Sequence, residues 1–163
     1  MNRIVVCDTG PLLHLHEAGA IHLLKCAGQI VIPPVVSQEL ETRLSLPPWV
    51  NVQRLDRSAQ RKAMEWSDRE ELDSGEAEAI ALALQLHGDW FLTDDALARQ
   101  FSESLGLETH GSIGFLLWAA ADGYVQDRNY AHELLHKLVN SSLWISHRVV
   151  EAASRAIDES FSE

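Results

Sequence analysis

The sequence predicts an α/β fold with three layers, in which helices cover both faces of a central parallel sheet. Apolar runs such as residues 4–7 and 29–32 have the continuous hydrophobicity of strands buried on both faces. Segments with helical spacing of apolar residues alternate with these runs, as they do around parallel sheets. The length of 163 residues suits one domain of this kind.

The positions of apolar runs, prolines and glycines place each element. We expect strands at residues 3–8, 29–32, 50–55, 89–93 and 107–109, giving a sheet of four or five strands. We expect helices from Pro11, after Pro34, and over residues 76–87, 96–105, 111–123, 128–139 and 146–157. Residues 56–73 are charged and weakly patterned, which predicts a mobile loop or a loosely packed helix. Residues 1–125 are predicted to form the core, and residues 126–163 a C-terminal helical hairpin packed on the same domain.

Composition excludes several classes of protein. The chain is 46% hydrophobic and 23% charged, which is typical of a globular protein. It has no apolar run of the roughly 20 residues that a membrane span needs, and its first residues do not resemble a signal peptide. Two cysteines, Cys7 and Cys26, are too few for a disulfide scaffold, so we expect buried free thiols in a reducing cytoplasm.

The net charge of −11 weighs against a protein that holds nucleic acid through a broad basic face. It is compatible with an enzyme acting on nucleic acid, because bound metal ions would offset the acids locally. It also suits a protein that docks onto a basic segment of a partner.

Carboxylates occur where the predicted strands end and where the following helices begin. Asp8 follows the first apolar run, and Asp94 and Asp95 follow the fourth. Glu39 and Glu76 fall in the first turns of predicted helices. The carboxyl ends of parallel strands share one edge of a sheet, so these acids should meet there. Because no lysine or arginine lies within these motifs, a hard divalent cation such as Mg²⁺ or Mn²⁺ is the expected compensation.

The same motifs resemble those of PIN-domain proteins, the fold of many toxin–antitoxin ribonucleases. The closest resemblance is to the branch with a Gly-Glu-x-Glu-Ala-Ile-x-Leu-Ala helix, here residues 75–83, and an Asp-Asp pair after the fourth strand, here residues 94–95. Residues 6–12 resemble the segment with the family's first acid, residues 32–39 the segment with its second, and residues 109–114 the segment after the last core strand.

The resemblance implies a three-layer PIN-like fold and a Mg²⁺- or Mn²⁺-dependent endoribonuclease that uses metal-activated water. The candidate catalytic residues are Asp8, Glu39, Glu76, Asp94 and Asp95, and those that would arrange the metal are Asp8, Glu76, Asp94 and Asp95. The fourth acid is either Asp94 or Asp95, and Glu78 competes with Glu76. Thr9 and Ser112 are hydroxyls expected near the site, either orienting water or phosphate or capping helices.

For partners, the resemblance implies an RNA substrate, an antitoxin or other regulatory protein, and a homodimer. Two alternatives stand beside the nuclease. One is a PIN-like interaction module without activity. The other is a zinc protease, since His132-Glu133-Leu134-Leu135-His136 fits the H-E-x-x-H pattern, although the leucines look like the buried stripe of a helix.

Overall fold

The computed structural model describes residues 2–69 and 71–162. Its strands are β1 (Ile4–Cys7), β2 (Gln29–Ile32), β3 (Val50–Val52), β4 (Trp90–Leu92) and β5 (Thr109–His110). Within the described residues they form one parallel sheet in the order β3-β2-β1-β4-β5. Val5, in the central strand, is level with Ile30 on one side and Trp90 on the other.

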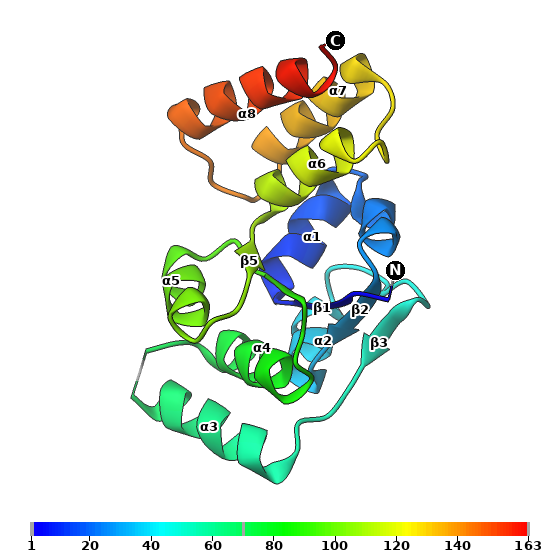
Figure 1. The fold of residues 1–163 in the computed structure, drawn as a ribbon. Coiled ribbons are helices and arrows are strands. Elements are labelled where there is room, and N and C mark those ends of the chain that lie inside the picture. The colour runs from blue at the N-terminus through cyan, green and yellow to red at the C-terminus, as the bar shows by residue number, and fades with distance from the viewer. Residues whose placement is uncertain (1, 70, 163) are drawn as a thin grey trace.

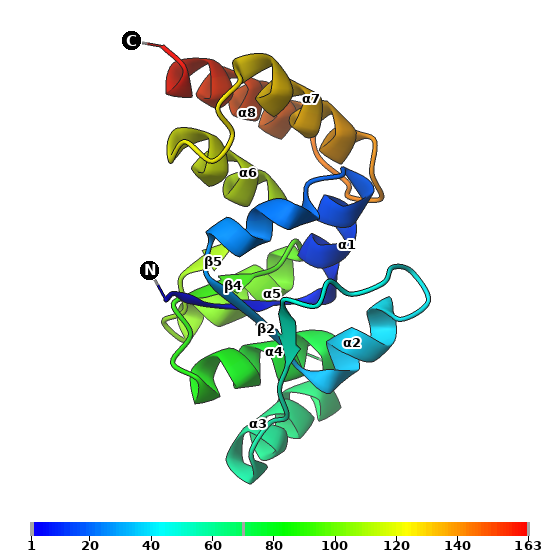
Figure 2. The same cartoon turned by 90° about the vertical axis from the view of Figure 1, so that its right-hand side faces the viewer.

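Helices cover both faces of this sheet, which confirms the predicted three-layer fold. They are α1 (Thr9–Glu17), the 3₁₀ helix η1 (Ile21–Cys26), α2 (Pro34–Leu40), α3 (Arg57–Asp68), α4 (Ser74–Gln85), α5 (Ala96–Ser104), α6 (Ser112–Ala121), α7 (Arg128–Val139) and α8 (His147–Ser160). Figures 1 and 2 show α1 on one side of the sheet with α6, α7 and α8 stacked beyond it. On the other side lies α4, with α3 outside it.

The core forms between the sheet and its two flanking helices. Val5 and Phe91 of the sheet are fully buried, as are Leu12 of α1 and Ile80 of α4. Helix α4 presents mostly alanine and leucine to the sheet, and such small side chains allow the helix to lie close to β1. This packing fixes the positions of the strand and helix ends that carry the predicted acidic residues.

The segment predicted as a mobile loop or loosely packed helix is a helix with definite packing. Asp56 caps α3 by accepting a hydrogen bond of 2.8 Å from the Ala59 backbone N–H. Ala59 and Ala63 are buried against α4, and Trp66 packs edge-on against Phe101 of α5 with ring centroids 5.0 Å apart. The buried side chains of α3 are alanines in an otherwise charged sequence, so its apolar pattern is too weak to predict a packed helix.

Helix α2 also differs from the prediction. It ends at Leu40 after seven residues, so Glu39 lies in its last turn and not in its first. Of the two free cysteines, Cys7 is buried and its environment raises the pKa of the thiol, whereas Cys26 is only half-buried. None of the helices in the described part of the chain is long and apolar enough to cross a membrane.

Gly28, at the start of β2, supports the pairing of the two central strands. Its φ is +144°, and a Cβ atom there would lie 2.2 Å from the Arg3 backbone oxygen. The Gln29 N–H donates to that same oxygen at 2.7 Å. Because backbone fills the space and the conformation excludes L side chains, Gly28→Ala should lower the free energy of unfolding by at least about 2 kcal/mol in denaturant titrations.

Gly114→Ala is the matched control. A Cβ atom on Gly114 meets nothing within 4 Å, and this residue lies in helix α6. The change should leave the free energy of unfolding the same or raise it by up to about 1 kcal/mol, since alanine favours a helix. Equal stability of the two variants would contradict the packing described at Gly28.

Candidate active site

A pocket of about 570 Å³ opens at the edge of the sheet where β1 and β4 end. Its acidic residues are Asp8, Glu39, Asp73, Asp94 and Asp95. We call it the acidic pocket. Of the described residues that line it, none is lysine or arginine. The fold therefore gathers acids from β1, α2, β4 and the start of α4, which are distant in sequence.

Most of these acids also cap helices. Asp8 caps α1, Asp73 caps α4 and Asp95 caps α5, and each carboxylate accepts a hydrogen bond of 2.8 Å from a backbone N–H in the first turn. Asp94 accepts one of 2.7 Å from the Ser112 N–H at the start of α6. The positive ends of these helix dipoles thus point at the carboxylates, which offsets part of their mutual repulsion.

Asp8 is the most deeply placed of the acids, with 7% of its surface exposed. The Thr93 hydroxyl, itself buried, donates to it at 3.0 Å. Burial raises the pKa of Asp8 to about 6, because a charged carboxylate loses its hydration there. The hydrogen bonds from Thr9 and Thr93 lower this pKa, and the charges of Asp73 and Glu39 raise it.

Asp94 and Asp95 have different surroundings, although they are adjacent in sequence. Both oxygens of Asp94 accept hydrogen bonds: Oδ1 from the Ser112 N–H, and Oδ2 from the Ser112 hydroxyl at 2.6 Å. His14 Nδ1 also lies 2.7 Å from Oδ2. Asp95 is exposed, and among the described residues only its Oδ2 has a donor, the Ala98 N–H. Asp95 therefore keeps an oxygen free for a ligand, and Asp94 ties three elements together.

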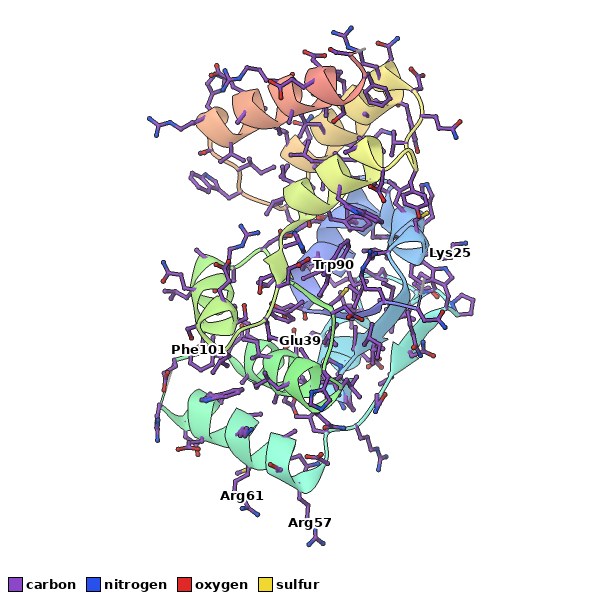
Figure 3. All side chains as sticks on the ribbon, in the orientation of Figure 1. Lys25, Glu39, Arg57, Arg61, Trp90 and Phe101 are labelled. Carbon is purple, nitrogen blue, oxygen red and sulfur yellow. The ribbon has the colours of Figure 1, made fainter. Side chains whose placement is uncertain are left out.

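Glu39 enters the pocket from α2 and is held by close contacts. The Thr9 hydroxyl donates to its Oε2. A Cβ atom on Gly75 would lie only 2.6 Å from its Oε1, so in this conformation the Glu39 carboxylate lies directly against the start of α4. Figure 3 labels Glu39 in the middle of the molecule, beside α4. The hydroxyls of Thr9 and Ser112 thus both contact acids of the site.

The acid that α4 contributes to the wall of the pocket is Asp73, which caps α4 and is not among the site residues predicted from the sequence. Glu76 lies behind it, and its Oε1 accepts a hydrogen bond of 3.0 Å from the Asp73 N–H. Burial, together with the charges of Asp73, Asp95 and Asp8, raises the pKa of Glu76 to about 8, although the hydrogen bond from the Asp73 N–H lowers it. Glu76 therefore belongs to the same electrostatic cluster without lining the pocket.

Glu78 lies elsewhere, in a hollow between α3 and α4 that Met64 and Ser74 also line. Burial raises its pKa, with a further contribution from the charge of Glu39. Glu76 thus interacts electrostatically with Asp73, Asp95 and Asp8, whereas Glu78 interacts with Glu39.

Two neutral or basic side chains of the pocket gave no signal in the sequence. His14 is one turn from the end of α1 and reaches the site only because α1 starts there. Trp144 comes from the loop between α7 and α8, more than 40 residues after the last acid, and 85% of its surface is exposed. Sequence spacing cannot place such residues, because tertiary packing alone brings them to the pocket.

The H-E-x-x-H motif is part of the packing between α7 and α8. His132 Nε2 lies 2.9 Å from an oxygen of Asp158, and Glu133 pairs with Lys137 at 3.5 Å. His136 Nε2 contacts the Asn140 side chain at 3.0 Å. Across residues 2–69 and 71–162, no three side chains of His, Cys, Asp and Glu are placed to hold a metal together, and the two histidines of the motif contact Asp158 and Asn140.

The donor set of the acidic pocket fits a hydrated divalent cation. Its groups are carboxylates, the ligands that Mg²⁺ prefers, and Mg²⁺ usually binds through only one or two of them while keeping several waters. Such an ion does not need the three converging ligands that the described residues lack. The free oxygen of Asp95 is available to such an ion.

Comparison with known proteins gives the family. A family model described as a PIN domain matches residues 4–159, nearly the whole chain. The chain belongs to the PIN domain family. PIN domains are usually nucleases and typically use divalent metals, so family membership supports a general role as a nuclease for this protein. A comparison with curated proteins gave no match.

The buried acids predict how the stability of the metal-free PIN domain depends on pH. The folded-state pKa of Asp8 lies above its unfolded value, so the folded protein holds that proton more tightly. The corresponding stability, roughly 3 kcal/mol, is present below about pH 4 and is lost as pH rises through about 6. Glu76 extends the loss toward about pH 8.

Denaturant titrations in EDTA should therefore show the free energy of unfolding falling between about pH 4 and 8. Asp8→Asn should flatten this curve, because asparagine still caps α1 but carries no charge. Asp127→Asn, at the N-cap of α7 and outside the pocket, is the control and should follow the wild type. Identical curves for Asp8→Asn and the wild type would contradict a raised pKa of Asp8 in the folded protein.

Proposed function

We propose that this PIN domain is a Mg²⁺- or Mn²⁺-dependent endoribonuclease that hydrolyses phosphodiester bonds with an activated water. The observation that carries the proposal is the convergence of Asp8, Glu39, Asp73, Asp94 and Asp95 in one pocket that no described lysine or arginine lines. Such a concentration of negative charge favours bound cations. Membership of a family of nucleases makes a phosphodiester the natural substrate.

Asp8 and Asp95 are the residues that would hold the ion directly, with Asp94 and Glu76 close behind them. The ion would supply the activated water and stabilise the charge that develops on the phosphate. Thr93 and the Thr9 N–H fix the Asp8 carboxylate on both of its oxygens, which preorganises it before any ligand binds.

The remaining groups act as positioning residues in this proposal. Ser112 and His14 hold Asp94 in place between β4, α6 and α1. The Thr9 hydroxyl orients Glu39 at the opposite side of the pocket. These contacts set the direction of each carboxylate, so that substrate binding requires little rearrangement.

The partners of the proposed enzyme follow from the family resemblance. RNA is the proposed substrate, and the protein is proposed to act as a homodimer that an antitoxin or other regulatory protein controls. The net charge of −11 supports a regulator with a basic binding segment. The arginines of α3 do not contribute to the site, since Arg57 and Arg61 point away from the body of the protein (Figure 3).

Asp8→Asn tests the nuclease directly. It preserves the α1 cap and the shape of the side chain but removes the buried charge. We expect the cleavage rate of a labelled single-stranded RNA in Mn²⁺ to fall by at least about 100-fold, as removal of a metal-holding group does. Asp127→Asn and His132→Ala should cleave at the wild-type rate, because neither residue lies at the pocket.

Cleavage that survives Asp8→Asn, or that His132→Ala abolishes, would reject the acidic pocket as the active site. A wild-type protein that binds RNA and never cleaves it would instead support the inactive interaction module.

Asp94 and Asp95 should separate structural from metal-binding effects. Asp95→Asn keeps the α5 cap and should weaken Mn²⁺ binding by about 10-fold or more, measured by calorimetry, with little change in stability. Asp94→Asn disrupts hydrogen bonds to Ser112 and His14, so it should lower the free energy of unfolding by about 1–3 kcal/mol. The opposite pattern would make Asp94 the fourth metal-holding acid.

A further inference from the structure

A second hollow continues from the acidic pocket between α5, α6 and the loop that joins α7 to α8. Its volume is about 490 Å³, which is within the range of sites for small ligands. It shares five lining residues with the acidic pocket, namely Asp94, Asp95, Ala96, Leu143 and Trp144. We call it the side groove. The two hollows therefore adjoin along these residues, and one extended ligand can contact both.

Trp144 stands at the junction of the two hollows. It is 85% exposed, the most exposed of the large hydrophobic side chains in the described chain. Ile113, Leu117 and Val149 give the groove apolar walls, while Arg99 and Gln100 supply polar groups. An exposed indole beside apolar walls and a guanidinium suits a ligand with a flat aromatic part and a negatively charged part.

The loop that carries Trp144 is anchored to the rest of the fold. The Ser142 hydroxyl and N–H donate to Glu17 Oε1 of α1 at 2.6 and 3.2 Å, and this bond lowers the pKa of Glu17. The Ser141 hydroxyl donates to the Leu138 carbonyl at 2.6 Å. Figure 2 shows this loop reaching down to α1. Trp144 is thus presented from a fixed position, which reduces the entropy lost on binding.

We propose that the side groove is a nucleobase subsite, in which the Trp144 indole stacks on an unpaired base next to the phosphate at the acidic pocket. This inference rests on the proposed nuclease function and specifies its substrate as single-stranded RNA. Stacking on aromatic side chains is the main way that proteins hold unpaired bases, and it accepts any base because each has a π-face. Arg99 lines the groove, where it can contact the flanking phosphate, and its pairing with Glu103 at 3.4 Å is exposed and therefore weak.

The test measures binding without cleavage, in the full-length chain carrying Asp8→Asn. Fluorescence anisotropy follows a labelled single-stranded RNA and a series in which each base in turn is replaced by an abasic site. Trp144→Ala should weaken binding of the intact RNA by about 10-fold, the usual effect of losing one stacked base. Trp144→Phe should stay close to the parent, because phenylalanine still offers an aromatic face.

One abasic position should weaken binding to the parent and leave Trp144→Ala unaffected, because the same contact is already lost. Leu97→Ala is the matched control: Leu97 is 67% exposed on α5 but lines neither hollow, so binding should not change. Intact affinity in Trp144→Ala, or additive losses with every abasic RNA, would overturn the inference.

A change in oligomeric state by light scattering in Trp144→Ala, with unchanged RNA affinity, would also overturn it and show that the groove is a protein interface. The result stays separate from the nuclease proposal. If the wild type cleaves RNA and Trp144→Ala binds normally, only the subsite is wrong. If base-dependent binding is present and the wild type cleaves nothing, only the nuclease is wrong.

Discussion

The accumulation of like charge at one edge of the sheet is the constraint on which this structure depends. Carboxylates from β1, α2, β4 and α4 meet there, and the described lining supplies no lysine or arginine. The compensation comes from backbone: the first turns of α1, α4, α5 and α6 donate N–H groups to Asp8, Asp73, Asp95 and Asp94. Helix dipoles lower the cost of the charges but do not cancel them. Burial raises the pKa values of Asp8 and Glu76, and the charges of neighbouring carboxylates add to this rise.

The hydroxyl groups give this arrangement its precision. Thr93 holds Asp8, Ser112 holds Asp94 and Thr9 holds Glu39. Each hydroxyl neutralises little charge, but each fixes the direction in which a carboxylate presents its remaining lone pairs. The carboxylates of the pocket are therefore held in fixed directions, while the repulsion between them remains unfavourable without a cation. That combination is what a site for a divalent ion requires, and it is why a PIN domain with a strongly acidic surface is compatible with a role as a nuclease.

The sequence was most informative where local chemistry and topology agree. Apolar runs ending in acids predicted the sheet and the edge where Asp8, Asp94 and Asp95 lie, and the structure and family match confirm that fold. It was least informative where packing decides. Asp73 was not among the predicted site residues, because whether a helix cap also faces a pocket depends on the tilt of its helix. Trp144 sits in a loop without any pattern, and the contact that places it, from Glu17 to Ser142, spans 125 positions.

The bond between Glu17 and Ser142 also bears on how the molecule can be divided. A boundary after residue 125 separates the sheet and its acids from α7 and α8, although α6, which precedes this boundary, is stacked with both helices (Figure 1). In addition, Ser142, Leu143 and Trp144 line the acidic pocket itself. A fragment truncated at that boundary would retain each acid and lose one wall of the cavity that surrounds them. The C-terminal hairpin is thus a structural part of the proposed reaction chamber, and shortened versions of this protein are poor substitutes for the whole in functional work.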